Sequence, residues 1–239
     1  MKAVIFAAGL GTRLKPLTDS MPKALVPLAG KPLLQWQVEK LCDAGIRDIV
    51  VNVHHFPDMI IDAVRANAGW GANITISDER NQLLDTGGGL RKIENGKWRM
   101  ENEPVLACNV DILSNIDIRA LVARYEETGA SQLVVSERST QRYLCFDADN
   151  RLCGWTNIAT GELKGTDGRH LAFSGMQILS PEVLRLLREA KEEKFSLIPF
   201  YLDIMHRADL HAYVPQDYRM MDVGKIDQIQ EAERFAEGL

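Results

Sequence analysis

A short apolar run near the start of the chain leads directly into a glycine-rich loop that also contains basic side chains. Residues 2–8 are apolar apart from Lys2, which predicts a short buried strand. Gly9 and Gly11 lack side chains at positions where backbone N–H groups would have to approach an anion closely. Arg13 and Lys23 add a forked cation and a compact one. The sequence therefore predicts a phosphate-binding loop after the first strand.

Two common glycine motifs do not describe this loop. The dinucleotide fingerprint G-x-G-x-x-G would place its third glycine where the chain has Leu14. The Walker A motif G-x-x-x-x-G-K-[ST] does not occur anywhere in the sequence. A tight turn with incidental glycines is the structural alternative, but it gives no reason for two cations placed around the loop.

Apolar periodicity predicts strands that alternate with helices over the first 140 residues. This alternation is typical of a doubly wound, mostly parallel α/β sheet. The expected strands and helices are 2–8, 32–44, 48–53, 56–68, 74–77, 86–95, 104–108, 118–128 and 132–136. Ligands of such sheets bind at the carboxyl ends of the strands, so the glycine loop and Asn109-Val-Asp111 should face one crevice.

The pattern changes near Tyr143, where short strands at 143–146, 152–156 and 170–173 are joined by turn-forming residues. We expect a small antiparallel excursion that covers the crevice, followed by helices at 181–191, 197–208 and 226–236. The length suits a single domain, residues 1–239, with a nucleotide-binding half (1–140) and a sugar-binding half (141–239).

Charge and cysteine content exclude several classes of protein. The net charge of −5 argues against a nucleic-acid surface, which is normally basic. The four cysteines form no C-x-x-C pair, so free thiols are expected and a zinc site is not. No signal peptide and no apolar stretch of membrane-spanning length is evident. A cytoplasmic protein that acts on small molecules is therefore expected, with its oligomeric state left open.

Two N-terminal segments resemble the signature of the sugar-nucleotidyltransferases, also called nucleoside-diphosphate-sugar pyrophosphorylases. Residues 7–18 read A-A-G-L-G-T-R-L-K-P-L-T, and residues 22–27 read P-K-A-L-V-P. Weaker similarity at 85–89, 109–111, 173–175 and 222–224 extends the resemblance over nearly the whole chain. It implies a Rossmann-like nucleotidyltransferase fold, Mg²⁺ as cofactor, and a nucleoside triphosphate and a sugar 1-phosphate as small-molecule substrates.

The resemblance also implies roles for individual residues. Arg13 would contact the leaving pyrophosphate and Lys23 the α-phosphate region, as the two catalytic cations. The metal would be held by Asp111 and Asp222, although Val110 and Met220 replace the family's usual glycine and tryptophan. The expected nucleotide-binding residues are Ala8, Gly9, Gly11, Thr12, Arg13, Lys23, Asp85, Gly88 and Asn109. The expected sugar-binding residues are Asn157, Ser174 and Gly175.

The T-G-G-G run at 86–89 most resembles the short uridylyltransferases of N-acetylmuramate 1-phosphate and related heptose and mannose 1-phosphate enzymes. Its structural alternative is a flexible helix N-terminus. Phe173-Ser-Gly175 is equally compatible with a core strand that has a glycine bulge. Trp155, Glu162 and Lys164 lie in the antiparallel excursion, and spacing alone assigns them no role.

The sequence therefore predicts a magnesium-dependent enzyme that joins a nucleoside triphosphate, with UTP favoured, to a sugar 1-phosphate, with N-acetylmuramate 1-phosphate favoured. Guanylyltransferases of mannose or heptose 1-phosphate and cytidylyltransferases of phosphocholine are the alternatives within the class. A catalytically inactive regulatory subunit that keeps the fold is the alternative outside it. The presence of all four charged residues, Arg13, Lys23, Asp111 and Asp222, argues against that last possibility.

Overall fold

The first three long strands of the chain form a parallel sheet. The computed structural model describes residues 1–100 and 102–239. Strand β1 (Lys2–Phe6) pairs in parallel with β4 (Asp48–Val53), which pairs in parallel with β5 (Asn73–Asp78). Residues 3–5 of β1 are fully buried. The predicted mixed α/β class with a mostly parallel sheet is confirmed for these strands.

The described residues form two compact units, and the chain leaves and re-enters the first of them. The first unit contains residues 1–85, 107–115 and 219–239, and the second contains residues 86–106 and 116–218. The second unit is thus inserted in the chain of the first, with the transitions close to β6 (Val105–Asn109). The boundaries of these units differ from those of the expected halves, 1–140 and 141–239. The assignment of nucleotide to one half and sugar to the other remains a prediction.

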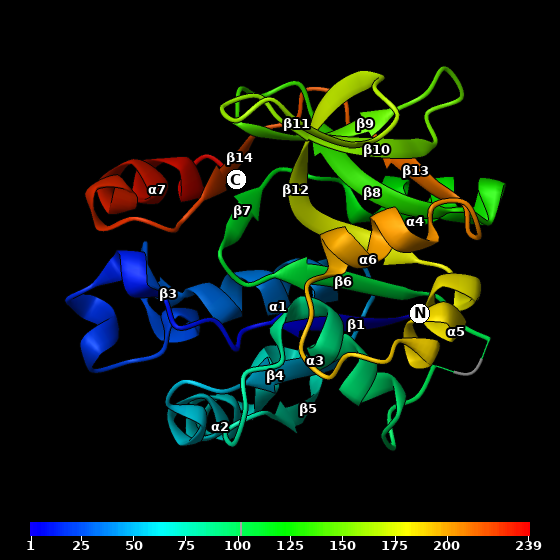
Figure 1. Ribbon diagram of the computed structural model, residues 1–239. Coiled ribbons are helices and arrows are strands. Elements are labelled where there is room, and N and C mark those ends of the chain that lie inside the picture. The colour runs from blue at the N-terminus through cyan, green and yellow to red at the C-terminus, as the bar shows by residue number, and fades with distance from the viewer. Residues whose placement is uncertain (101) are drawn as a thin grey trace. The chain divides into compact units, whose positions relative to one another are not determined.

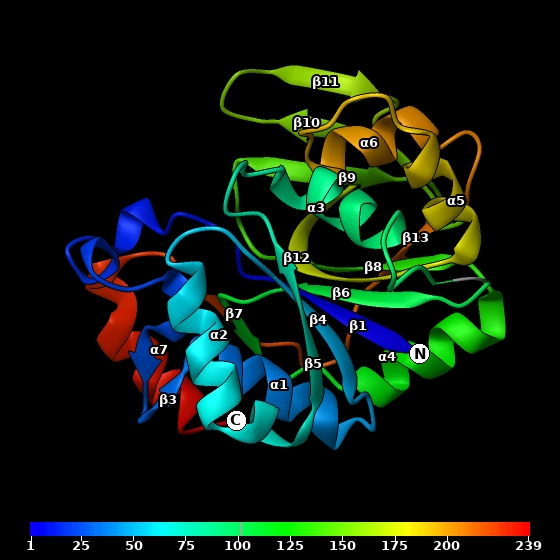
Figure 2. The same ribbon diagram turned by 90° about the horizontal axis from the view of Figure 1, so that it is seen from below.

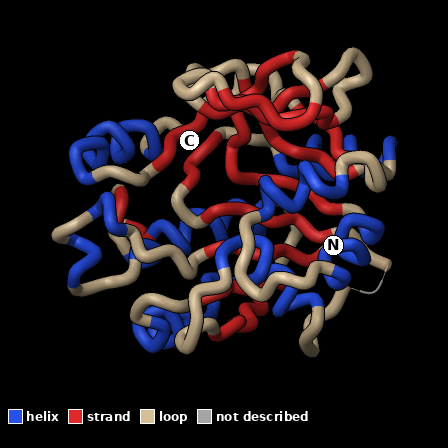
Figure 3. Tube along the Cα trace, viewed as in Figure 1, coloured by secondary structure: helices blue, strands red, loops and turns tan. Residues whose placement is uncertain are grey.

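In the first unit, helices α1 (Leu33–Asp43) and α2 (Pro57–Ala66) lie on the same side of β4 and β5 (Figure 2). Helix α1 ends where Gly45 adopts a positive φ of 87°. The segment between β1 and α1 is mostly loop with short helical turns (Figure 3). The remaining elements of this unit are β2 (Pro27–Leu28), β3 (Lys31–Pro32), β7 (Ile112–Ser114), β14 (Met220–Asp222), α7 (Ile229–Ala236) and five 3₁₀ turns at 12–14, 17–19, 23–25, 68–71 and 226–228.

The second unit contains the antiparallel strands. Its long curved strand β12 (Arg169–Leu179) pairs with β9 (Arg142–Phe146) near its start and with β8 (Ser131–Ser136) further along (Figure 1). Strand β9 pairs with β10 (Leu152–Asn157), which pairs with β11 (Glu162–Gly165), and all these pairings are antiparallel. The predicted antiparallel excursion is confirmed, and β11 is an additional strand that the sequence analysis did not predict.

Helix α4 (Ile118–Thr128) of the second unit begins and ends as its sequence indicates, whereas the helix expected at 197–208 ends at Ile204. The side chain of Asp117 accepts hydrogen bonds from the backbone N–H groups of Arg119 and Ala120 at the start of α4, and Gly129 ends that helix with a φ of 67°. The remaining elements are α3 (Asp85–Glu94), α4 (Ile118–Thr128), α5 (Pro181–Glu189), α6 (Leu197–Ile204) and β13 (Leu210–Tyr213), which pairs in parallel with β8. Within residues 1–100 and 102–239, every helix is too short or too polar to cross a membrane.

Candidate active site

The glycine loop is held in shape by bonds to Gly11. Gly11 has a φ of 63°, and a Cβ atom there would lie 2.8 Å from the Cγ2 atom of Thr18. The carbonyl of Gly11 accepts hydrogen bonds from the N–H of Leu14 and the hydroxyl of Thr18, both at 2.8 Å. A Cβ atom at Gly9, in contrast, would meet nothing within 4 Å. Gly11 is thus required by the fold, whereas Gly9 leaves open space beside the loop.

A buried polar chain that the sequence analysis missed fixes the start of the loop. The side-chain oxygen of Asn52, on β4, accepts hydrogen bonds from the N–H groups of Ala7 at 2.7 Å and Ala8 at 3.3 Å. The amide nitrogen of Asn52 donates to Glu79 at 2.9 Å, and Glu79 also accepts from the N–H of Leu84. Since Asn52 and Glu79 are almost fully buried, these bonds order the loop from within the unit.

Lys23 and Asp111 form the most buried charged pair of the candidate site. The ammonium of Lys23 contacts a carboxylate oxygen of Asp111, and the side chains are 9% and 19% exposed. Lys23 begins a short 3₁₀ turn, and Asp111 follows β6. The residue between Asn109 and Asp111 is buried, and the N–H of Val110 donates to the carbonyl of Phe6 at 3.2 Å. Val110 in place of glycine therefore packs into the core and leaves the Asp111 carboxylate beside Lys23.

Arg13 and Asp222 form a second, more exposed pair. A terminal nitrogen of Arg13 lies 3.8 Å from a carboxylate oxygen of Asp222, and both side chains are about half exposed. Gly224 allows this arrangement, because a Cβ atom there would lie 2.7 Å from Asp222 Oδ1 and 2.8 Å from an Arg13 terminal nitrogen. The Asp-Val-Gly run thus supplies both the carboxylate and the space for the guanidinium.

A two-stranded ribbon brings the two aspartates together. Strand β14 pairs antiparallel with β7, with Asp222 opposite Ile112, and the N–H of Val223 donates to the carbonyl of Asp111 at 2.8 Å. Helix α1 supports the ribbon, since the side chain of Gln37 donates to the carbonyl of Ile112 at 2.6 Å. Residues about one hundred positions apart in the sequence therefore place their backbones side by side, as the predicted metal site requires.

Lys40 supports the same ribbon from helix α1. Its ammonium donates to the carbonyl and the hydroxyl of Ser114 in β7. Burial lowers the pKa of Lys40 to about 8, because the charged ammonium is removed from water. The ribbon is thus held by an amine whose charge costs free energy in the folded protein.

The donor chemistry at the ribbon suits a magnesium ion. Mg²⁺ prefers hard oxygen ligands and is usually held by one or two carboxylates together with phosphate oxygens and water. Asp111 and Asp222 supply two carboxylates on adjacent strand ends, each beside a cation. Both would be expected to hold such an ion when the phosphates of a substrate are present.

The T-G-G-G run forms the first turn of α3. The N–H groups of Gly87 and Gly88 both donate to the carbonyl of Phe195, at 2.8 and 3.1 Å. A Cβ atom at Gly87 would lie 2.4 Å from the ring of Phe195, so glycine is needed for this close packing. Asp85 precedes the run with a φ of 63°. The packing with Phe195 is a structural role, and the nucleotide-binding roles expected for Asp85, Gly88 and Asn109 stay predictions.

The predicted sugar-binding residues occupy three different local settings within the second unit. Asn157 ends β10, and its side chain accepts from the N–H of Ala159 in the turn that follows. Gly175, with a φ of 71°, lies in a bulge of β12 where the pairing with β8 shifts register. The hydroxyl of Ser174 is buried and finds no hydrogen-bond partner in the described part of the chain. The glycine-bulge interpretation of Phe173-Ser-Gly175 is confirmed, and its sugar-binding role stays a prediction.

A cavity in the second unit contains basic and aromatic side chains that the sequence analysis did not combine. Its volume is about 460 Å³. Arg138, Arg142 and Lys164 line it together with the aromatic rings of Tyr143 and Trp155. The ammonium of Lys164 lies 5.6 Å from the centre of the Trp155 ring. A pocket that joins three cations to two aromatic rings suits an anionic ligand with a flat or apolar face.

The remaining lining comes from Phe173 and from the segment around α6, and it includes Thr140, Leu144, Ser196, Ile198, Pro199 and Leu202. The expected residues Asn157, Ser174 and Gly175 are absent from this lining. Arg138 and Arg142 were missed because isolated exposed cations are usually only solvated. The useful signal was two arginines four residues apart, the second of which begins β9 next to Tyr143.

Comparison with known proteins agrees with this arrangement. A family model described as nucleotidyl transferase matches residues 2–238. The N-acetylmuramate alpha-1-phosphate uridylyltransferase of Neisseria meningitidis serogroup B is 31% identical over 239 residues, which cover 99% of this chain and 98% of the relative. The enzyme of that name from Caulobacter vibrioides is 31% identical over 208 residues, covering 83% of this chain and 82% of the relative.

Among solved structures, HddC from Yersinia pseudotuberculosis complexed with GMP-PN is 25% identical and superimposes with a TM-score of 0.76. The match covers 98% of this chain and 99% of the HddC chain. The family match extends along almost the whole chain and agrees with the glycine loop and the paired cations and carboxylates. The chain therefore belongs to the nucleotidyl transferase family and is an enzyme of the sugar-1-phosphate nucleotidyltransferase type.

Proposed function

We propose that this enzyme transfers a uridylyl group from UTP to N-acetylmuramate 1-phosphate in a magnesium-dependent reaction. The observation that favours this substrate is the cluster of Arg138, Arg142 and Lys164 in the cavity of the second unit. N-acetylmuramate differs from simpler N-acetylhexosamines by a lactyl carboxylate, which adds a negative charge to that of the phosphate. A carboxylate is the group that arginine binds with paired hydrogen bonds. Two similar proteins that are named N-acetylmuramate alpha-1-phosphate uridylyltransferases support this choice of substrates.

The proposed reaction is an in-line displacement at the α-phosphorus of the nucleotide. An oxygen of the sugar phosphate forms a bond to that phosphorus, and the bond to the oxygen bridging the α- and β-phosphates breaks, which releases pyrophosphate. Both reactants are anions, so catalysis consists mainly of positioning them and of neutralising the developing charge. No proton transfer to or from a side chain is needed for this balance.

Lys23 and Arg13 would share the neutralisation. The ammonium of Lys23 is nearly buried, so its charge is weakly screened and its position is restricted. We assign Lys23 to the α-phosphate, where the charge changes most during the displacement. Arg13 is about half exposed and can turn its fork towards the leaving pyrophosphate.

Asp111 and Asp222 would hold the magnesium ion. Bound there, the ion would neutralise phosphate charge and make the phosphorus more electrophilic. Without nucleotide the two carboxylates are balanced by Lys23 and Arg13. Nucleotide binding adds several negative charges, so the site should bind the ion more tightly once phosphates are present.

The same cavity weighs against two alternatives. Three cations would repel the quaternary ammonium of phosphocholine. Mannose 1-phosphate has no second acidic group, so it would offer these cations one anionic group fewer than N-acetylmuramate 1-phosphate does. A guanylyltransferase of mannose or heptose 1-phosphate remains the second candidate, because HddC with its bound guanine nucleotide analogue superimposes over nearly the whole chain.

A panel of four nucleoside triphosphates against matched sugar phosphates tests the proposal, with pyrophosphate release as the measurement. N-acetylglucosamine 1-phosphate is the matched control, because it lacks only the lactyl group. We expect UTP with N-acetylmuramate 1-phosphate to have the highest kcat/KM, at least about 10-fold above the control sugar. Highest turnover with GTP and mannose 1-phosphate would reject the proposed substrate pair, and no turnover with any pair would favour a regulatory subunit.

Variants of the cavity then locate the discrimination. Arg142→Ala and Lys164→Ala should each lower kcat/KM for N-acetylmuramate 1-phosphate by about 10-fold, since each removes a charged hydrogen-bond donor. Turnover of N-acetylglucosamine 1-phosphate should change by less than about 2-fold. Arg185→Ala, which removes an exposed arginine paired with Glu189 on α5, is the control. Equal losses for both sugars would assign these cations to the shared phosphate instead of the carboxylate.

A further inference from the structure

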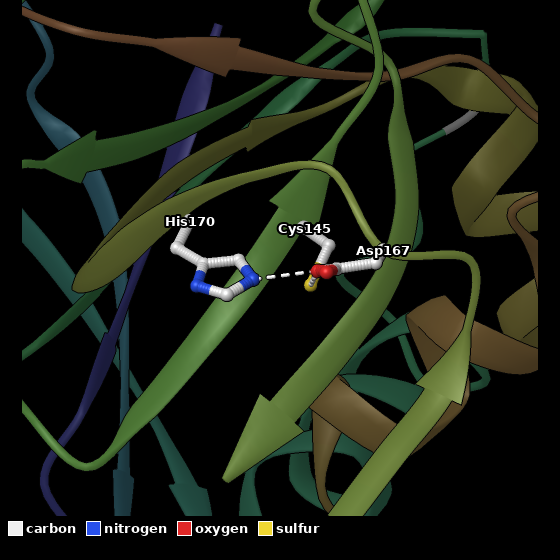
Figure 4. Close-up of side chains that lie close together, drawn as sticks. All are labelled: Cys145, Asp167 and His170. Atoms are coloured by element: carbon white, nitrogen blue, oxygen red, sulfur yellow. Dashed lines mark hydrogen bonds and ion pairs between the residues drawn. The ribbon is translucent and has the colours of Figure 1, made fainter. Parts of the chain in front are cut away.

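Three side chains of different chemical type meet on the antiparallel sheet of the second unit, away from the cavity lining. Cys145 lies on β9 and His170 on β12, and the two residues are directly opposite each other in the antiparallel pairing. Side chains opposite each other in such a pair point to the same face. Asp167, in the turn between β11 and β12, completes the group (Figure 4).

The distances between the donor atoms are those of a preformed cluster. The Nε2 atom of His170 lies 2.6 Å from Asp167 Oδ1, and Cys145 Sγ lies 3.9 Å from that oxygen. The three donor atoms all lie within 4.8 Å of one another. Four-coordinate zinc with bonds of 2.0–2.3 Å places its ligand atoms about 3.3–3.6 Å apart. Side-chain movements of about 1 Å would therefore bring the three atoms onto one ion.

The surroundings fix each of the three side chains. The N–H of Gly168 donates to Asp167 Oδ1 at 2.9 Å, and the His170 ring stacks on Tyr143 with 5.7 Å between ring centres. Cys145 is fully buried, whereas Asp167 and His170 are partly exposed and leave a path for an ion from solvent. A second thiol is close by, because Cys153 Sγ lies 3.4 Å from the Cys145 carbonyl.

A nucleophilic cysteine site does not fit this geometry. A cysteine nucleophile needs the imidazole next to the thiol, with the carboxylate behind the imidazole. Here the oxygen of Asp167 contacts both the thiol and the imidazole. Burial also raises the pKa of Cys145 to about 11, so the free thiol does not ionise at neutral pH.

We propose that Cys145, Asp167 and His170 bind a zinc ion that fastens the β11–β12 turn to the sheet. A thiolate, an imidazole and a carboxylate together form a ligand set that zinc accepts readily, with water in the fourth position. The ion takes the place of the proton between His170 and Asp167. That proton moves to the other ring nitrogen, and the thiol proton is released to solvent.

The site would act on the sugar-binding side of the enzyme without taking part in the reaction. Strand β11, which leads directly into the segment that the ion would fasten, contains Lys164, which lines the cationic cavity. Zinc binding should therefore raise the thermal stability of the protein, since the ion binds the folded state preferentially. This inference does not depend on which sugar the cavity takes.

Cobalt titration of the full chain tests the proposal, because a thiolate–cobalt bond gives a near-ultraviolet charge-transfer band that carboxylate ligands alone do not give. The protein is kept reduced with a phosphine, titrated with CoCl₂, and then with ZnCl₂. We expect a band that saturates at one cobalt per chain and that zinc abolishes. Absence of the band in the wild-type protein at millimolar cobalt would overturn the proposal.

Variants identify the ligands. Cys145→Ser should abolish the band, and His170→Gln and Asp167→Asn should each weaken cobalt binding by at least about 10-fold. Cys42→Ser removes another free cysteine, on α1 of the first unit, and should leave the band unchanged. If Cys145→Ser lowers the melting temperature without metal, the partly exposed His170→Gln still decides the question. A band that survives in both Cys145→Ser and His170→Gln would place the metal elsewhere and reject the site.

Discussion

The two candidate ligand-binding regions, one in each unit, present their charges in different ways. In the first unit, Lys23 and Asp111 are largely removed from water and contact each other directly. In the second unit, Arg138, Arg142 and Lys164 line an open cavity, and the Lys164 side chain is 58% exposed. Burying the first pair is costly unless each charge has a partner. The cavity cations cost little because they are partly exposed, with Lys164 paired with Glu162 at 3.4 Å and Arg138 donating to the carbonyl of Phe173.

Under the proposed function, the buried pair serves the step common to the family, and the exposed cations serve the selection of a substrate. Buried charges keep their positions and act at short range with little screening, which suits the invariant chemistry of phosphate transfer. Exposed charges can be replaced one at a time with small effects on folding, which suits recognition of one sugar among several. The comparison predicts that variants of the first unit lose rate and variants of the second lose selectivity.

The largest effect is expected for Lys23→Met. Turnover should fall by about 10³-fold, because the variant removes a weakly screened cation from the α-phosphate. Stability should fall by about 1–3 kcal/mol, because Asp111 loses its partner while remaining partly buried. Pyrophosphate release and urea denaturation measure the two quantities.

The double variant Lys23→Met/Asp111→Asn separates the two effects. Both members of the pair are then uncharged, so most of the lost stability should return while activity stays low. Recovery of both activity and stability would show that the Lys23–Asp111 pair is only structural. It would also reject the expectation that variants of this pair lose rate.

A smaller loss is expected for Arg13→Ala, about 10²-fold in kcat/KM, because the leaving pyrophosphate loses its forked cation. The unfolding free energy should stay within about 0.5 kcal/mol of the wild-type value, since the pair with Asp222 is half exposed. Arg13→Lys keeps the positive charge but not the forked guanidinium, so its kcat/KM should lie between those of the wild type and Arg13→Ala. Unchanged steady-state kinetics in Arg13→Ala would remove Arg13 from the proposed mechanism.

Asn52→Ala tests whether order in the phosphate loop matters apart from its charges. The side chain holds the N–H groups of Ala7 and Ala8, so we expect a loss of about 2–3 kcal/mol in stability and about 10-fold in kcat/KM. Differential scanning calorimetry and initial rates are the measurements. A stability loss with no change in rate would mean that the buried chain supports the fold without positioning the loop.

The smallest effect concerns Lys40 and is a dependence of stability on pH. Its pKa is about 8 in the folded protein, below the usual value of 10.5, so the unfolded chain holds more protons between these values. Stability should therefore rise as the pH increases through 8, by about 1 kcal/mol between pH 7 and pH 9. Denaturation of the wild type and of Lys40→Met at both pH values isolates this contribution. A difference between the two proteins that does not change with pH would contradict the lowered pKa.

Sequence patterns predicted the elements that depend on local signals. The glycine loop, the strand before Asn109 and the switch to antiparallel pairing near Tyr143 each follow from apolar runs and turn residues close together in the chain. Asp111 and Asp222 came from resemblance to a family, and the structure adds the ribbon that places their backbones together.

What could not be predicted depends on contacts between distant residues. Asn52 is the only polar residue of β4 after its first residue, Asp48, and only the structure shows that it holds Ala7 and Glu79. Strands β7 and β14 have three residues each, too few for a period to be recognised. The cluster of Cys145, Asp167 and His170 joins two strands and a turn, so no linear spacing indicates it.

The insertion of residues 116–218, the larger part of the second unit, between Asn115 and Arg219 has a consequence for the order of folding. These residues are 104 positions apart, yet their backbones are bonded where the ribbon begins. Closing a flexible loop of that length costs about 4 kcal/mol in chain entropy. Prior folding of the inserted segment would replace this flexible loop by a body whose two ends already lie together. Asp222 should therefore join Asp111 late in folding, so that the capacity to bind metal and nucleotide arises only after the sheet of the second unit has formed.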